Sequence, residues 1–259
     1  WKYDDATKLG KDSHSWLGRL NNIRTALQGQ QGDRRLRLGI AGGEWKKMMA
    51  DATARTRFAS EVKKIIEQYE FDGVDFDFEW PANASEYNNY SATVIQMRST
   101  LGKYVYFTAS LHPVSFKISP EAIDALDFIS YQCYGPAVMR FPYEQFVKDG
   151  EAAVAYGIPK NKLVMGVPFY GSTGSLIAAY CDFVSDGLAT TKEDTYTYKG
   201  NTYTFNSIET IRKKARYVCE EDYAGIMSWD LATDIDITNN KSLLKVIKEE
   251  FEYYANPTE

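Results

Sequence analysis

The chain has 259 residues, of which 44% are hydrophobic and 25% charged, and this length allows one large buried core in a globular domain. The net charge of −5 and the dispersed lysines and arginines argue against a polyanion-binding surface, so we expect no nucleic-acid partner. No apolar run approaches the ~20 residues of a membrane-spanning helix, and three cysteines with two histidines fit neither a disulfide framework nor a zinc site.

Helices are predicted wherever apolar residues recur at amphipathic spacing. These segments cover residues 16–27, 58–69, 90–101, 120–126, 146–156, 207–218 and 243–251. Ser119, followed by Pro120, has the sequence of an N-cap and first helical position, and Ser207 can cap a later helix.

Strands are predicted between the helices, in short apolar runs bounded by turn residues. They cover residues 36–40, 73–79, 104–111, 128–134, 163–170 and 224–231. Strands that alternate with helices over the whole length predict parallel βαβ units and favour a (β/α)8 TIM barrel over an open doubly wound sheet. Because only six strands are found, and none ahead of residue 36, we expect that one or two N-terminal barrel strands are missing. Residues 1–259 are predicted to form one such domain, with a short hairpin insertion around residues 190–206.

An acidic strand stands out between Phe71 and Trp80, where Asp75, Asp77 and Glu79 alternate with apolar residues. In a strand, alternate side chains point to the same side, so the three carboxyl groups share one face while the apolar residues pack on the other. A single acid in such a strand usually belongs to a solvated face. Three acids opposite a strongly apolar face instead indicate a functional site.

Four other predicted strands end in residue types that can bind or react. These ends are Ala41-Gly42-Gly43, His112-Pro113, Tyr134-Gly135 and Trp229-Asp230. In a βα barrel, catalytic groups lie where the strands end and the βα loops begin, so the ends should meet on one rim. Each end taken alone is weak evidence, since a strand-terminal aromatic residue belongs to the core more often than to a site. Their occurrence together on one rim is the stronger argument.

The stretch Asp72-Gly73-Val74-Asp75-Phe76-Asp77-Phe78-Glu79 resembles the D-G-x-D-x-D-x-E signature of glycoside hydrolase family 18, the chitinases and endo-β-N-acetylglucosaminidases. Supporting stretches occur in the family's order at residues 41–43, 131–135, 166–171 and 225–230. The resemblance implies a (β/α)8 barrel and a retaining, substrate-assisted mechanism. It requires no cofactor and no metal.

The resemblance also implies a role for each acid. Glu79 would protonate the glycosidic oxygen and then activate water, while Asp77 would hold the N-acetyl group of the substrate. Asp75 would support Asp77 from below and share a proton with it, because two close carboxylates in a dry interior do not readily both ionise. Tyr134 would donate a hydrogen bond to the acetamido oxygen.

Substrate contacts are expected from four further residues. By resemblance, Trp229 would form the floor of the sugar subsite, and counting back by two from Tyr134 puts Gln132 on the same inward face. Gln132 fits a buried amide equally well. Tyr170 and Trp80 are weaker candidates, for which packing in the core or at the rim is the alternative.

Because of two departures from the family pattern, the sequence does not decide which substrate is preferred. Gly135 stands where many chitinases have the Asp of Met-x-Tyr-Asp, so an acid contact to the sugar is missing. Ile40 stands at the Ser of Ser-x-Gly-Gly, which removes a hydroxyl that often supports the buried Asp. The segment after residue 171 has room for a hairpin but not for a large added domain, which favours an open cleft and endo-type cleavage.

The expected partner is therefore an oligosaccharide or polysaccharide that contains β-1,4-linked N-acetylglucosamine, either a chitin-type oligomer or the chitobiose core of N-glycans. A carbohydrate-binding protein without activity is an alternative, although such proteins usually lose the acid and Glu79 is present. A metal-dependent barrel enzyme that uses the Asp cluster is another, but alternate strand residues spread the carboxyls further than one ion needs. We expect a monomer in an extracellular, periplasmic or cell-surface location, where such polymers occur.

Overall fold

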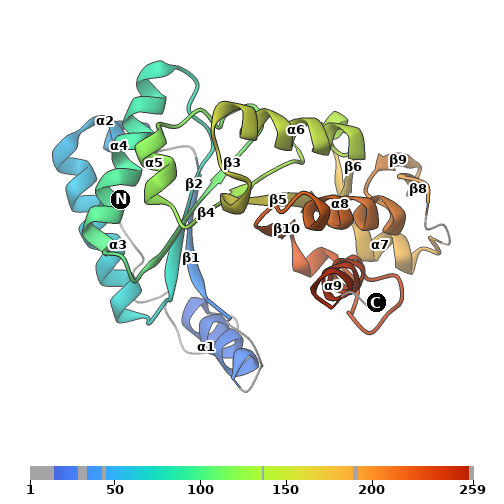
Figure 1. Ribbon diagram of the computed structural model, residues 1–259. Helices are drawn as coiled ribbons and strands as arrows, with labels where there is room; N and C mark the ends of the chain where they lie inside the picture. The colour runs from blue at the N-terminus through green and yellow to red at the C-terminus, as the bar shows by residue number, and fades with distance from the viewer. Residues whose placement is uncertain (1–14, 29–33, 43–44, 136, 189–191, 257–259) are drawn as a thin grey trace.

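The computed structural model describes residues 15–28, 34–42, 45–135, 137–188 and 192–256. Its centre is a parallel sheet in which the six predicted strands follow one another in the order β1-β2-β3-β4-β5-β10 (Figure 1). The strands are β1 (Arg37–Gly42), β2 (Gly73–Phe78), β3 (Tyr106–Leu111), β4 (Phe128–Tyr131), β5 (Leu163–Pro168) and β10 (Gly225–Trp229).

The sheet of the described residues is not closed, because β1 and β10 pair with one neighbour each. Residues 1–14 and 29–33, which precede β1, lie outside the described part of the chain, as does Gly43. The expected one or two additional N-terminal strands therefore remain a prediction.

Helices lie before, between and after the strands. They are α1 (Trp16–Leu27), α2 (Lys46–Ala50), α3 (Ala52–Gln68), α4 (Ala84–Leu101), α5 (Pro120–Ala125), α6 (Tyr143–Tyr156), α7 (Tyr180–Ser185), α8 (Ile208–Glu220) and α9 (Leu243–Ala255). In Figure 1, α3, α4 and α5 lie along one half of the sheet, and α6, α8 and α9 lie along the other. Both predicted N-caps are confirmed, since the hydroxyls of Ser119 and Ser207 each accept the backbone N–H three residues later at 3.3 Å.

Strand β2 buries one face completely. Val74, Phe76 and Phe78 have no exposed surface, and both phenyl rings stack on Tyr90 of α4, with ring centroids 5.3 and 6.1 Å apart. Burial of a side chain of this size contributes about 1.5–3 kcal/mol. This packing fixes the register of β2, so that Asp75 and Asp77 must point to the opposite side of the sheet.

Two predicted strands end earlier than their apolar runs. The run 128–134 is paired only to Tyr131, because the Cys133 N–H donates to the Tyr131 carbonyl at 2.9 Å and the chain turns. The run 163–170 divides at Phe169 into β5 and a separate strand, β6 (Tyr170–Ser172). Both runs stay apolar beyond the last paired residue because the residues that follow are still buried, although they no longer belong to the parallel sheet.

A second, antiparallel sheet follows, in the order β7-β6-β9-β8. Its other strands are β7 (Ile177–Ala179), β8 (Thr195–Tyr198) and β9 (Asn201–Thr204). The predicted hairpin is confirmed as β8 and β9, with Lys199 and Gly200 at φ values of 48° and 77° as a tight hairpin turn requires. Residues 189–191, in the predicted insertion, lie outside the described residues. The sequence missed β6 and β7, since three residues are too few to show a period of two.

Candidate active site

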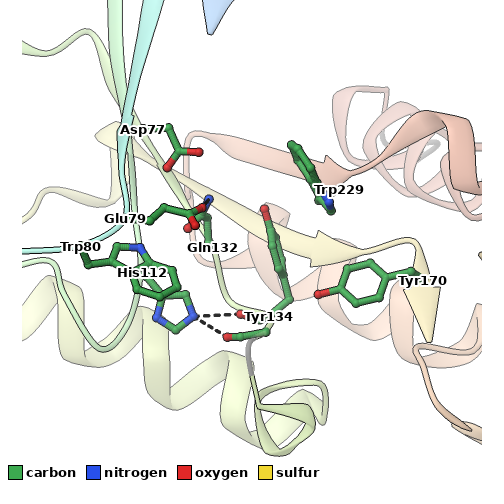
Figure 2. Close-up of a pocket in the computed structure, with 9 residues that line it drawn as sticks. Asp77, Glu79, Trp80, His112, Gln132, Tyr134, Tyr170 and Trp229 are labelled. Carbon is green, nitrogen blue, oxygen red and sulfur yellow. Dashed lines mark hydrogen bonds between the residues drawn. The ribbon is translucent and has the colours of Figure 1, made fainter. Parts of the chain in front are cut away.

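A cavity of about 280 Å³ opens where β2, β3, β4 and β10 end. Its lining consists of Asp77, Glu79, Trp80, His112, Gln132, Tyr134, Gly135, Tyr170 and Trp229. Figure 2 shows Asp77 and Glu79 on one side and Tyr134, Tyr170 and Trp229 on the other. Seven of the eight residues proposed from the sequence therefore meet in one cavity, and Asp75 is the exception.

Glu79 is the most accessible acid of the site. It follows the last paired residue of β2 and is exposed, so its carboxyl group can meet a bound molecule. The amide of Gln132 donates to Glu79 Oε1 at 3.4 Å. This contact gives Gln132 a defined place in the cavity, next to the acid.

Asp77 lies one strand step deeper. Its Oδ1 is buried and has no hydrogen-bond partner among the described residues. Burial, with the nearby charges of Glu79 and Asp75, raises the pKa of Asp77 to about 7. A buried, unpaired carboxyl oxygen at the bottom of a cavity is costly unless a ligand supplies the missing partner.

Asp75 lies behind the cavity, where neighbouring strands satisfy its carboxylate. Ser110 Oγ donates to Oδ2 at 2.7 Å, Thr108 donates to Oδ1, and Arg37 on β1 lies 3.3 Å from the same oxygen. Among these described contacts there is no hydrogen bond between Asp75 and Asp77, so the expected shared proton has no counterpart in the geometry. Thr108 and Ser110 were missed as site residues, although they alternate with His112 along β3 and so share its face.

The interpretation of Ile40 as a lost supporting hydroxyl is wrong. Ile40 pairs in register with Phe76 and is only 6% exposed, so it faces the helix layer and not the acids. Gly39 and Ala41 are the β1 residues in register with Asp75 and Asp77. The hydroxyls on Asp75 come from β3, and nothing needs to be replaced at position 40.

Tyr134 lies opposite the acids and is 7% exposed. Burial first, and then the nearby Tyr170 and Asp77, raise the pKa of its hydroxyl, which therefore stays protonated and can donate. Gly166 on β5 makes room for the ring, because a Cβ at that position would lie 2.8 Å from Tyr134 Cε1 and 2.6 Å from the Tyr131 carbonyl oxygen. The hydroxyl lies 3.5 Å from Met227 Sδ.

Three more aromatic residues shape the cavity. Trp229 is 55% exposed and presents a flat indole, as a sugar-binding surface does. Trp80 has a buried indole nitrogen without a partner among the described residues. Tyr170 packs edge-on against Tyr134, and burial raises its pKa to about 12. Its hydroxyl would lie 3.0 Å from a Cβ at Gly135, so Tyr170 occupies the space where a side chain at 135 would begin.

The sequence marks His112 only as a strand end. It is 1% exposed, and its Nε2 lies 2.9 and 2.5 Å from the carbonyl oxygens of Tyr134 and Gly135. Its ring lies 4.9 Å from that of Trp80, and burial lowers its pKa. His112 thus connects the segment after Glu79 with the segment that carries Tyr134 (Figure 2).

The arrangement suits acid–base chemistry on an uncharged, flat ligand. It combines an accessible carboxyl, a buried carboxyl with an unpaired oxygen, a tyrosine donor and an exposed indole. No group of three or more His, Cys, Asp or Glu side chains suited to a metal ion occurs in the described ranges. Among the same residues, no helix is long and apolar enough to span a membrane.

Known proteins of similar sequence and fold include several chitinases. Probable chitinase 2 of Drosophila melanogaster is 23% identical over 297 residues, covering 84% of this chain, which spans 60% of that relative's length. A chitinase structure from Bacteroides thetaiotaomicron has a TM-score of 0.78 at 23% identity, covering 92% of this chain and 82% of that chain. A class V chitinase variant from Nicotiana tobaccum, solved in complex with NAG4, has a TM-score of 0.72 at 18% identity, covering 91% and 85%.

These likenesses confirm the predicted fold class, with the difference that the sheet of the described residues is open. The family model of the glycosyl hydrolases family 18 matches residues 2–234, which include both sheets and all eight predicted site residues. The chain therefore belongs to glycosyl hydrolases family 18.

Proposed function

We propose that this protein is a retaining glycoside hydrolase that cleaves β-1,4-linked N-acetylglucosamine in chitin-type oligomers, with the acetamido group of the substrate as the nucleophile. The observation that carries the proposal is the distribution of carboxyl groups in the cavity. Only Asp77 and Glu79 supply carboxyls among its lining residues, and both come from the end of β2. A two-carboxylate mechanism needs an acid and a second carboxylate that flank the scissile bond. The opposite side of this cavity offers tyrosine and tryptophan instead.

In the first step, the protonated carboxyl of Glu79 donates its proton to the glycosidic oxygen, and the bond from that oxygen to C1 breaks. The acetamido carbonyl oxygen bonds to C1 and gives an oxazolinium ion. Asp77 Oδ1, which has no other partner among the described residues, accepts the acetamido N–H and stabilises the developing positive charge. The Tyr134 hydroxyl donates a hydrogen bond to the acetamido oxygen and so orients it for attack.

In the second step, the Glu79 carboxylate takes a proton from water, and the water oxygen bonds to C1 as the oxazolinium ring opens. The anomeric configuration is retained because C1 is attacked twice, on opposite faces. Trp229 supports the sugar at the floor, and Gln132 holds the Glu79 carboxyl in place. Tyr170 and Trp80 complete the wall of the subsite.

Chitin-type substrates are preferred over the chitobiose core of N-glycans because the relatives reported above are named chitinases and one is bound to NAG4. Internal cleavage is proposed because Glu79 and Trp229 are both exposed, which leaves the cavity open to a continuing chain. Chitin binding and an extracellular, periplasmic or cell-surface location follow from the same substrate. We also propose that the chain acts as a monomeric single domain.

The test is incubation of the protein with chitotetraose and, separately, with a high-mannose glycoprotein, followed by mass analysis of the products. Chitotetraose should yield shorter oligomers. Glu79→Gln should lower turnover at least ~1,000-fold, with an unchanged circular dichroism spectrum, because it removes the proton donor alone. Release of glycan from the glycoprotein alone would assign the endo-β-N-acetylglucosaminidase activity instead. Binding without turnover of either substrate would contradict an enzymatic function.

A further inference from the structure

His112 is a buried titratable side chain that the proposed chemistry does not use. It directly follows β3, it lines the cavity, and its side chain makes no hydrogen bond to either acid. With 1% exposure, it must place all of its polar atoms against protein groups or a bound ligand. The partners of its two ring nitrogens therefore decide what it can do.

Those partners select one form of the ring. The backbone N–H of Val114 donates to Nδ1 at 3.1 Å, so Nδ1 carries no proton. Nε2 lies beside two carbonyl oxygens, which only accept, and so Nε2 carries the proton and donates. The ring is thus neutral, and both of its nitrogens have hydrogen-bond partners in the protein, so neither is left for a substrate.

The two carbonyl oxygens belong to the segment that carries Tyr134. Pairing within the parallel sheet ends at Tyr131, and the last backbone bond from this segment to β3 is from Gln132 N–H to the Leu111 oxygen at 2.8 Å. Beyond that point the chain turns, with Gly135 at a φ of 34°. Among the described residues, His112 is therefore the side chain that bonds to the carbonyl oxygens of Tyr134 and Gly135 (Figure 2).

The imidazole also lies against Trp80, with the two ring centroids 4.9 Å apart. Trp80 directly follows Glu79 in the chain. His112 is consequently in contact with both segments from which the reacting groups project, one for the acid and one for the tyrosine donor.

We propose that His112 is a positioning residue, which holds the Tyr134 peptide so that the Tyr134 hydroxyl meets the acetamido oxygen in the transition state. This inference rests on the proposed function. Misplacement of a group by about 1 Å can cost about 100-fold in rate. The effect is expected in kcat more than in KM, because the contact strengthens as the oxazolinium ion forms.

Two substitutions distinguish the effect of the Nε2–H donor from the effect of the space that the ring fills. His112→Leu fills the space without donating, and we expect it to lower kcat about 30- to 100-fold while KM changes less than threefold. His112→Gln retains an N–H at the end of a side chain of similar reach and should recover most of that loss. Val114→Ala is the matched control, because the Val114 side chain is 57% exposed and its backbone N–H is kept, and it should stay within twofold of the wild type.

A double-mutant cycle distinguishes positioning from a general loss of stability. If His112 acts through the Tyr134 hydroxyl, His112→Leu should have less than a threefold effect in a Tyr134→Phe background. An effect that persists in full in that background, or a kcat of His112→Leu equal to that of the control, would overturn the proposal. Should His112→Leu fail to fold, His112→Asn takes its place, since its shorter side chain cannot reach the two carbonyl oxygens.

Amide hydrogen exchange gives a readout that needs no activity. Residues 131–135 should exchange faster in His112→Leu than in His112→Gln or Val114→Ala, while exchange in β2 stays the same. If the wild-type protein hydrolyses neither substrate, the proposed function fails, and this exchange pattern still reports whether His112 holds the segment. If turnover occurs but exchange in 131–135 is unchanged, the positioning role alone is refuted.

Discussion

Asp77 is a side chain whose position costs stability and which the proposed mechanism uses. Its Oδ1 is buried without a partner among the described residues, whereas the carboxylate of Asp75, two positions earlier, has three donors. Period-two counting along β2 predicted that both point to one face, and this is confirmed. Period-two counting could not predict that only Asp75 would have hydrogen-bond donors for both carboxylate oxygens. Those donors come from β1 and β3, so they depend on the strand order.

Substitution of Asp77 should reveal this cost as a pH-dependent gain in stability. The pKa of Asp77 is raised from 3.8 to about 7, so the stability that its protonated form provides is present below pH 3.8 and lost as pH rises through 7. Asn cannot ionise. At pH 8, the free energy of unfolding of Asp77→Asn should therefore exceed that of the wild type by on the order of 2 kcal/mol, after allowance for partial exposure. Its denaturant midpoint should be correspondingly higher.

At pH 4 the same two proteins should differ little in their denaturant midpoints, since Asp77 is then protonated in the wild type. Activity of Asp77→Asn should be strongly reduced at both pH values. An equal shift of the midpoint at pH 4 and pH 8 would show that ionisation of Asp77 is not the cause.

At the scale of the element, the sequence predicted β2 well and β4 poorly, for one physical reason. β2 is apolar on one face and polar on the other, and its apolar side chains are completely buried by α4 and its neighbours. The run 128–134 is buried on both sides, so its sequence carries no mark of where pairing stops. After the turn at Tyr131, the chain contacts His112 and Tyr170, which lie far away in the sequence.

Gly166 on β5 sets how closely Tyr134 can approach the sheet. A Cβ there would lie 2.6 Å from a backbone oxygen and 2.8 Å from the Tyr134 ring, both too close without displacement. Gly166→Ala should destabilise the protein by about 1–3 kcal/mol and also lower kcat, because the ring must move. Thermal unfolding and steady-state kinetics check the two effects.

Gly39→Ala is the comparison for that substitution. Gly39 is also a strand glycine of the central sheet, but a Cβ added there would meet no atom within 4 Å and its φ is not positive. It should leave stability and kcat close to the wild-type values. Equal effects of the two substitutions would mean that the contact with Tyr134 does not matter.

At the scale of the whole molecule, the alternation of strands and helices was enough to predict the barrel class and six of its strands. It could not predict the antiparallel sheet beside the barrel, because β6 and β7 have three residues each and are held by their neighbours. One apolar core contains residues from β1 through α9. The prediction of a single domain therefore implies that the chain unfolds cooperatively, as one unit.

We expect residues 1–259 to unfold in one calorimetric transition, with the van't Hoff enthalpy equal to the calorimetric enthalpy. Chitotetraose should raise the unfolding temperature of Glu79→Gln. At a chitotetraose concentration 100 times the dissociation constant of the complex, the gain in the free energy of unfolding is about 2.7 kcal/mol. Two separate transitions, of which only one responds to the oligosaccharide, would contradict a single domain.

The path of the chain through the sheet also bears on biosynthesis. Glu79 follows the second strand of the described sheet and Trp229 belongs to β10, which joins the sheet beside β5. A nascent chain that has emerged only as far as the segment after β4 carries the acid and Tyr134 but not the indole floor. If Trp229 forms the floor of the sugar subsite, as proposed, sugar binding can begin only once β10 has been synthesised and docked. Activity would then require that translation and folding have both proceeded through that strand.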